Sequence, residues 1–307
     1  MDITITATAK SLLQATKLLE VGVDVLYIGN VKFGVRLVHS FTREELKKII
    51  LMAHQAGAKV AVAVNALMHP EKIKSVLKYL RFLENFWADY IVVSDPGVIF
   101  LLQKKKLNLA YVYEASVFVT SAKQVNFWAK KGATLAVLAR ELPAKELFLM
   151  RDKFLIPTEI LVYGATVIQH SKRFLLQNYF HFIKADENPS RSRNWFLVEP
   201  QNPHLHYSIF EDCHGTHIFA NNDLNLLLEL DKLSSWGYHH WKLDGLYTPE
   251  ENFIKIVELF VKAKLMIKAG KWDSLKASLL NESVRFYHPE NRGLDAGFFI
   301  LDPKDIN

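Results

Sequence analysis

The sequence has little of what several classes of protein depend on. It contains a single cysteine, Cys213, among 307 residues, which excludes an internal disulfide framework and any metal cluster held by four thiolates. Its most apolar segment, 90–102, is interrupted by Asp95-Pro96 and falls short of the roughly 18 residues that cross a bilayer. The first residues, Met-Asp-Ile-Thr, lack the basic and apolar parts of a signal peptide. We therefore expect a cytoplasmic protein with no membrane association.

Several motifs that mark ligand-binding and catalytic loops are also missing. No Gly-x-Gly-x-x-Gly follows a predicted strand and no phosphate-loop lysine motif occurs, which argues against the standard dinucleotide and nucleotide sites. The chain also lacks a Gly-x-Ser-x-Gly elbow, a His-Glu-x-x-His pair and a recognisable cysteine–histidine pair. The motifs therefore identify no type of protease.

The composition is that of a folded globular protein with a basic excess. Half of the residues are apolar and 23% are charged, which is an ordinary balance. The net charge is +6 and the isoelectric point is about 9.1. This excess favours an acidic partner such as RNA, but a solvated basic surface explains it at least as well.

Short apolar runs alternate with amphipathic stretches along most of the chain. The runs are rich in β-branched residues and apolar on both faces, as in parallel strands that helices cover. In one helical stretch, Thr42 and Glu45 form a capping box and Gly57 ends the helix. The predicted strands span 3–7, 25–28, 59–64, 90–93, 110–113, 135–138, 160–163 and 239–243. The predicted helices span 11–21, 42–55, 71–85, 98–105, 122–131, 144–154, 224–236 and 249–268.

Eight strands in alternation with eight helices predict an α/β fold, a TIM-like (β/α)8 barrel over residues 1–268. The alternation is lost between 165 and 222, which predicts an inserted subdomain between strands seven and eight. Its short strands are expected at 195–198, 207–210 and 217–220. The less regular segment 269–307 is expected to be a C-terminal extension that packs on the barrel. An open doubly wound sheet is the alternative fold.

Polar residues follow most of the predicted strands. In a (β/α)8 barrel these strand ends open on one face, which holds the active site. Our catalytic candidates, at the ends of strands six and eight, are Arg140, Glu141, Lys242 and Asp244. Our ligand-binding candidates at the same rim are Asn65, Asp95, Glu114 and Tyr163, beside Asn30, Arg36 and Ser116. Such a ring suits an anionic or hydrogen-bonding ligand, although capping residues and structural ion pairs would give the same pattern.

Basic and aromatic residues alternate in and around the predicted insertion. They are Lys172, Arg173, Lys184, Arg191 and Arg193, with Phe174, Tyr179 and Trp195. Because aromatic rings stack on bases while basic side chains neutralise phosphates, this pattern favours a looped or flexible RNA. The RNA-binding candidates are Lys172, Arg173, Arg191, Arg193 and Trp195. Alternatively, the aromatics form the core of the insertion and the charges its solvated face.

A group of potential metal ligands also lies in the insertion. It consists of His204, His206, Cys213, His214 and His217. Zinc accepts such ligands, but the spacing matches no standard finger. We expect no metal here.

Several motifs at the strand ends resemble those of the peptidase U32 family, the collagenase-like proteases. They are Ser94-Asp95-Pro96-Gly97, Arg140-Glu141-Leu142, Gly164-Ala165, Arg173 with Asn178-Tyr179, Asn222-Asp223-Leu224, Lys242-Leu243-Asp244-Gly245 and the turn-rich segment 291–299. The resemblance covers most of the chain. It relates the chain to proteins that hydroxylate wobble uridine in transfer RNA or a cytidine in ribosomal RNA.

The chain departs from this family at the positions of its metal ligands. Family members with an iron–sulfur cluster use four cysteines, and the matching positions here are Val167, Phe174, a residue within 188–193, and Asn225. Cluster irons need thiolates, which valine and phenylalanine do not provide. In addition, Glu114 and Ser116 stand where the family has serine and glutamine. The resemblance therefore implies a protein without the cluster, and we expect no cofactor.

These observations lead to one expected function and two alternatives. We expect an accessory paralogue in RNA hydroxylation, at wobble uridine of tRNA, that binds RNA and acts with a cluster-bearing U32 relative. The first alternative is a hydrolase of the U32 type that uses the rim carboxylates. The second is a barrel that binds a small ligand without catalysis. Whether the chain is an enzyme stays open at this point.

Overall fold

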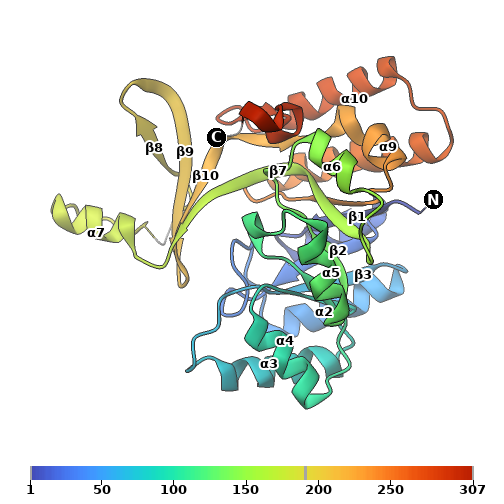
Figure 1. Ribbon diagram of the computed structural model, residues 1–307. Coiled ribbons are helices and arrows are strands. Elements are labelled where there is room, and N and C mark those ends of the chain that lie inside the picture. Colours follow the sequence, from blue (N-terminus) through green and yellow to red (C-terminus); the bar gives the residue numbers. More distant parts are fainter. Residues whose placement is uncertain (1, 190–191, 306–307) are drawn as a thin grey trace.

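The computed structural model describes residues 2–189 and 192–305. Its centre is a closed barrel of parallel strands (Figure 1). These strands are β1 (Thr4–Thr8), β2 (Val25–Gly29), β3 (Lys59–Val64), β4 (Tyr90–Val93), β5 (Tyr111–Tyr113), β6 (Ala133–Val137), β7 (Thr158–Ser171) and β11 (His240–Leu243). His240 of β11 lies opposite Thr4 of β1 on one side and Glu159 of β7 on the other, which closes the ring. The predicted (β/α)8 barrel is confirmed.

Helices connect successive strands and cover the outside of the barrel (Figure 1). They are α1 (Leu12–Glu20), α2 (Arg43–Gln55), α3 (Ile73–Asn85), α4 (Pro96–Lys105), α5 (Ala122–Lys130), α6 (Ala144–Met150), α8 (Leu230–Ser235) and α9 (Glu250–Lys268), with the short turn η1 (Ser116–Phe118) after β5. The predicted capping box of Thr42 and Glu45 is confirmed at the start of α2. In β3, Val60, Val62 and Val64 are buried against the helices, whereas Ala61 and Ala63 belong to the interior of the barrel.

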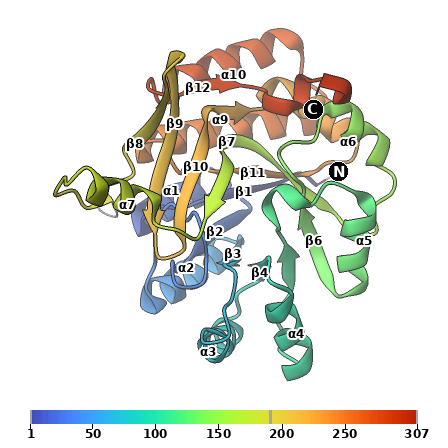
Figure 2. The same cartoon turned by 60° about the vertical axis from the view of Figure 1, so that its left-hand side comes forward.

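Strand β7 does not end at the rim of the barrel, as the predicted span 160–163 required. Its outer half forms an antiparallel sheet with β10 (Gly215–Asn225), followed by β9 (Asn202–Asp212) and β8 (Trp195–Glu199). Helix α7 (Leu175–Phe182) follows β7. We call residues 165–222 the arm; it projects to one side of the barrel, with α7 at its far end (Figures 1 and 2). The three strands predicted for the insertion are present and longer than expected.

Gly164 marks the point where β7 leaves the barrel. Its φ angle is +126°, and a Cβ atom there would lie 2.3 Å from the carbonyl oxygen of Asp244. Only glycine combines this backbone conformation with so close an approach. The Gly164-Ala165 motif is therefore required by the crossing of β7 over the end of β11.

Two predictions for the second half of the chain are wrong. The helix predicted over 224–236 begins only at Leu230, because Leu224 and Asn225 still pair with Gly164 and Tyr163 of β7. The C-terminal extension from residue 269 onward, which we call the tail, is more regular than expected. It contains α10 (Ser274–Tyr287), β12 (Gly293–Asp295), η4 (Gly297–Ile300) and η5 (Pro303–Asp305). The short turn η3 (Leu227–Glu229) precedes α8.

The tail packs on the barrel and also holds the arm. β12 pairs with β10 from Asn222 to Leu224. Arg292, just before β12, forms a buried ion pair with Asp223 at 2.6 Å and donates to the carbonyl of Ala220 at 2.9 Å. Among the residues described, no helix has the length and apolar character that crossing a bilayer requires.

Candidate functional site

A group of charged and polar side chains fills the C-terminal end of the barrel interior. Lys242 of β11 lies 3.7 Å from the carboxylate of Glu114, which follows β5. Asn65, at the end of β3, donates to both Glu114 and the hydroxyl of Tyr27, each at 3.3 Å. These four side chains are buried, and the strand register brings them together from distant parts of the sequence.

Three further charged residues lie close enough to interact electrostatically with this group. The electrostatic neighbours of Glu114 include Arg36, in the loop after β2, and Arg140, beyond β6; those of Asp244, after β11, include Arg140 and Lys242. We call Arg36, Asn65, Glu114, Arg140, Lys242 and Asp244 the mouth cluster. It holds three cationic and two acidic side chains, so one positive charge is in excess when all are ionised.

Burial and neighbouring charges act in opposite directions on the two acids. Burial on its own raises the pKa of Glu114, but the charges of Lys242, Arg140 and Arg36 outweigh it, so the pKa lies below its usual value. Burial dominates for Asp244 and raises its pKa, although Lys242 and Arg140 oppose this. Glu114 is thus the ionised partner of the cations, while Asp244 is the acid that is closer to taking up a proton.

The backbone is strained at two positions beside the cluster. Arg36 and Ser116 both have left-handed φ angles, +56° and +51°, and the guanidinium of Arg36 donates to the hydroxyl of Ser116 at 2.7 Å. A residue other than glycine in this conformation costs of order 1 kcal/mol or more, and such strain concentrates at functional sites. From the sequence both residues could be assigned only to the rim, because backbone strain leaves no mark in a single sequence.

The structure separates some of the predicted site residues from the cluster. Asp95 caps α4 and accepts from the backbone amides of Gly97 and Met68, each at 2.7 Å. Tyr163 points outward, and its hydroxyl lies 3.0 Å from Nδ1 of His288 and 3.1 Å from the hydroxyl of Thr248. Both positions were predicted from strand ends, and both side chains are occupied by structural contacts.

Glu141 also differs from its predicted position alongside Lys242 and Asp244. Arg140 and Glu141 follow one another in a turn, and both line a separate cavity of about 360 Å³ beside the arm and η4. Other residues around it are Thr166, Asn221, Asn222, Asp295 and Phe298. In the part of the chain that the structure describes, the buried Oε2 atom of Glu141 has no hydrogen-bond partner. Arg140 therefore joins the two sites, whereas Glu141 belongs to the outer one.

The RNA-binding candidates divide into exposed and packed residues. Lys172 and Arg173 are exposed on the arm. Arg193 is packed instead: it donates to the carbonyl of Leu37 at 2.7 Å and stacks over Phe210, and burial lowers its pKa. Trp195 belongs to the core of the arm, with its ring 5.0 Å from that of Phe180. Arg191 lies outside the described residues.

Helix α7 and the residue before it expose aromatic rings, only some of which were predicted to contact RNA. Phe174 and Tyr179 are 43% and 56% exposed, as stacking candidates should be. Phe182 is 84% exposed and was not singled out. The exposure of Phe182 could have been predicted from the sequence, because α7 carries apolar residues on more faces than one packed face can bury.

The histidines of the arm form internal contacts. Nε2 of His217 lies 3.1 Å from Asp212, and its ring stacks on that of His170 at 4.4 Å. His214 reaches the carbonyl of Val31. No group of three or more His, Cys, Asp or Glu residues suited to a metal ion occurs within residues 2–189 and 192–305.

The positions that match the family's cysteines do not suit an iron–sulfur cluster. Val167 is buried in an apolar cluster with Phe210 and Phe219, and the side chain of Asn225 donates to Asn281 at 2.8 Å and accepts from the amide of Leu227 at 3.1 Å. Phe174 is an exposed ring, and Cys213 is elsewhere on the arm. With no thiolate at these positions, the residues do not fit the cluster.

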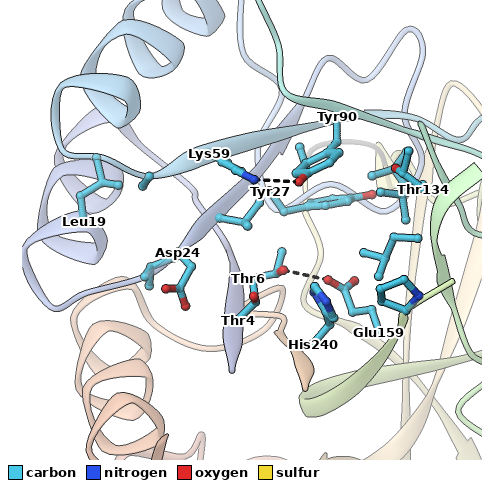
Figure 3. Close-up of a pocket in the computed structure, with 18 of the residues that line it drawn as sticks. Thr4, Thr6, Leu19, Asp24, Tyr27, Lys59, Tyr90, Thr134, Glu159 and His240 are labelled. Atoms are coloured by element: carbon cyan, nitrogen blue, oxygen red, sulfur yellow. Dashed lines mark hydrogen bonds between the residues drawn. The ribbon is translucent and has the colours of Figure 1, made fainter. Parts of the chain in front are cut away.

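A second cavity, of about 550 Å³, lies at the opposite, N-terminal end of the barrel (Figure 3). Thr6, Tyr27, Glu159 and His240 are among its lining residues. Active sites of (β/α)8 barrels lie at the C-terminal end, so the position of the mouth cluster agrees with the general rule and this cavity does not.

The chain is similar to several known proteins. The chain is 32% identical to tRNA hydroxylation protein P2 of Bacillus subtilis (strain 168) over 289 residues, 93% of each chain. It is 26% identical to tRNA hydroxylation protein P of Escherichia coli (strain K12), covering 90% of this chain and 70% of that protein. It is 21% identical to a collagenase of Porphyromonas gingivalis (strain ATCC BAA-308 / W83), covering 89% and 69%.

A solved structure and a family model also match this chain. The solved structure of the U32 peptidase Mk0906 superposes with a TM-score of 0.50 at 16% identity, covering 80% of this chain and 92% of that one, which supports the fold alone. Residues 10–307 match the model of peptidase family U32. The chain belongs to peptidase family U32.

Proposed function

We propose that this protein is a cluster-less accessory subunit in the hydroxylation of tRNA, at wobble uridine, and that it acts with a cluster-bearing U32 relative. One observation carries the proposal: the chain matches tRNA hydroxylation protein P2 over 93% of its length, yet has no thiolate where the family holds its cluster. Bacillus subtilis (strain 168), the source of protein P2, also has tRNA hydroxylation protein P1, which is 27% identical over 73% of this chain. Two such relatives in one organism support a division of tasks between copies. We propose that this hydroxylation takes place in the cytoplasm.

The mouth cluster supports a role in binding rather than in redox chemistry. Its excess positive charge suits an anionic group, which Arg36, Arg140 and Lys242 would bind while Asn65 donates a hydrogen bond. Asp244, with its raised pKa, would supply or accept a proton at this end of the barrel. Ligand-binding roles for Asp95 and Tyr163 and a catalytic role for Glu141 remain proposals of lower rank, because these side chains lie apart from the cluster.

The arm is the proposed contact with RNA. Lys172, Arg173 and Lys184 are exposed beside α7, whose rings of Phe174 and Tyr179 face solvent. Basic side chains and exposed rings thus occur together on the arm, which projects from the barrel (Figure 2), and this supports a surface for phosphates and bases. Arg193 and Trp195 would hold the shape of the arm instead of touching RNA directly.

A peptidase role has weaker support. The family description and the collagenase relative favour it. However, the hydroxyls near the mouth are engaged: that of Ser116 accepts from Arg36 and that of Ser94 donates to the carbonyl of Glu114. A hydrolytic nucleophile needs a neighbouring base instead.

The test is reconstitution from two chains. The protein, alone and co-expressed with a cluster-bearing U32 relative from the same genome, is purified and assayed for bound tRNA, iron and the partner chain. Nucleoside mass spectrometry of tRNA then compares wild-type cells with cells lacking this chain. We expect stable co-purification, iron only in the partner, and less hydroxylated uridine in the deletion strain. Iron and sulfide bound stoichiometrically to this chain alone, or unchanged tRNA after its deletion, would contradict the proposal.

A further inference from the structure

The cavity at the N-terminal end of the barrel is large enough for a small molecule. Its volume of about 550 Å³ lies within the roughly 300–1,000 Å³ of known ligand sites. It opens between loops that precede β2, β3 and β7, where Gly22, Gly57 and Pro157 line it. Tyr27 lies between this cavity and the mouth cluster, because its ring lines the cavity and its hydroxyl bonds to Asn65.

The cavity exists because the barrel interior is built from small side chains at this level. Layers of bulky branched residues normally fill such a barrel. Here Thr4, Thr6 and Ala61 take inward positions that a larger aliphatic side chain would fill. Protein interiors otherwise contain few voids larger than a water molecule, because empty space forfeits dispersion contacts. A space of this size is therefore expected to hold solvent or a ligand.

One buried carboxylate stands in the wall without a complete set of partners. Glu159 is 4% exposed, and its Oε2 atom accepts from the hydroxyl of Thr6 at 2.7 Å. Within the described ranges, no second donor contacts this carboxylate. Burial raises the pKa of Glu159, and the charge of Lys242 offsets this only in part. Buried carboxylates are normally satisfied by several donors, so this one has room for another.

The other ionisable groups around the cavity are either paired or uncharged. Asp24 is paired with Lys264 at 2.6 Å and accepts from the amide of Ile5. Lys59 lies at the exposed opening and donates to the hydroxyl of Tyr90 at 3.1 Å. Burial lowers the pKa of His240, which keeps its imidazole neutral near pH 7. Glu159 is thus the acid that a bound ligand would meet.

The remaining walls are aromatic and aliphatic. Tyr27 and Tyr90 lie across the cavity from Thr6, Glu159 and His240 (Figure 3). Val25, Ala61, Val92 and Leu135 complete the lining. Two tyrosine faces and aliphatic side chains suit a flat apolar group, and tyrosine faces also attract cations.

We propose that this cavity binds a small organic amine that carries an aromatic or aliphatic group, with its ammonium on Glu159 and its apolar part against Tyr27 and Tyr90. The ammonium supplies the donors that the carboxylate lacks, together with the charge that its burial requires. The site is independent of the proposed role in tRNA hydroxylation, which concerns the opposite end of the barrel and the arm.

The experiment uses the full chain and three matched probes: benzylamine, benzyl alcohol and benzoate. Binding is measured by isothermal titration calorimetry and by saturation-transfer NMR near pH 7. We expect benzylamine to bind about tenfold or more tightly than benzyl alcohol, since hydrogen bonds to charged groups are the stronger ones. Benzoate should not bind. Benzoate that binds as well as benzylamine, or no binding of any probe at millimolar concentration, would overturn the proposal.

Variants then test the charge of Glu159 and the volume of the cavity separately. Glu159→Gln keeps the shape and should bring the affinity for benzylamine down to that for benzyl alcohol. Ala61→Leu and Val92→Phe fill the cavity and should abolish binding of both probes, while Glu258→Gln on the outer face of α9 should change neither. Thermal unfolding checks that each variant is folded. If the filling variants fail to fold, Glu159→Gln decides alone: an amine preference that survives this change would contradict the assignment.

Discussion

The ammonium group of Lys242 lies 3.8 Å from the centroid of the Tyr27 ring, in the centre of the barrel. The same ammonium approaches Glu114 on the mouth side, while the Tyr27 ring lines the N-terminal cavity. Lys242 therefore links the two ends of the barrel interior electrostatically. It is also the residue whose loss would leave a buried carboxylate without its nearest ammonium.

Lys242→Met should destabilise the fold by about 3 kcal/mol, because removal of one partner leaves Glu114 buried and less compensated. Arg36 and Arg140 remain nearby and limit the loss. Urea unfolding followed by circular dichroism measures it. The double variant with Glu114→Gln is the control and should regain part of the lost stability. A single variant as stable as the wild type would show that the pair contributes no net stability.

The closed barrel was predictable because each strand carries its own local signal. Val60, Val62 and Val64 alternate with Ala61 and Ala63, and helix caps such as Thr42 punctuate the chain at regular intervals. These signals depend only on neighbouring residues. The length of β7 was not predictable in this way, because its outer half is stabilised by pairing with β10, some 50 residues further along.

The candidate site was predictable as a position but not as a set of contacts. Strand ends correctly placed Asn65, Glu114 and Lys242 near one another. They could not show that Tyr163 turns outward, because a register shift between β7 and β11 at this point changes the direction of its side chain. The buried carboxylate of Glu159 was missed altogether, since a glutamate at the start of a strand is usually exposed.

The pH dependence of stability should change in Glu159→Gln. Burial raises the pKa of Glu159 in the folded state above its ordinary value of 4.5. The wild type therefore loses stability as pH rises from about 4.5 through the folded pKa, because the buried carboxyl must ionise. The variant lacks this loss, so its stability relative to the wild type should increase between pH 4 and pH 7. Urea unfolding at both pH values measures the difference, and a difference that shrinks with pH would contradict the raised pKa.

Arg292→Met should loosen the junction of tail, arm and barrel. Arg292 and Asp223 are both buried, and the variant leaves Asp223 without its cation, at a cost of about 4 kcal/mol. Hydrogen exchange should accelerate in β10 and β12, which this pair joins. Arg285→Met, at an exposed position on α10, is the matched control and should change neither quantity. Unaltered protection of β10 and β12 would mean that strand pairing alone holds the junction.

The last prediction concerns RNA and separates exposed from packed residues of the arm. Each phosphate contact that is lost should reduce the slope of log affinity against log salt by about 0.7 to 0.9. Because Lys172 and Arg173 are exposed, their double replacement by alanine should flatten the slope for tRNA without lowering the melting temperature. Arg193→Ala should do the reverse, since its guanidinium is committed to Leu37 and Phe210: the arm should be less stable, with little change of slope.

Filter binding of tRNA between 50 and 300 mM salt, set beside thermal unfolding, gives both readouts. Lys255→Ala with Lys262→Ala, two exposed lysines on α9, removes the same charge from another part of the surface and is the control. If this control flattens the slope as much as the arm variant, the attraction comes from net charge. If neither variant alters the slope, RNA does not contact the arm. A loss confined to the arm variant would place tRNA on the element that carries the exposed rings of Phe174 and Tyr179.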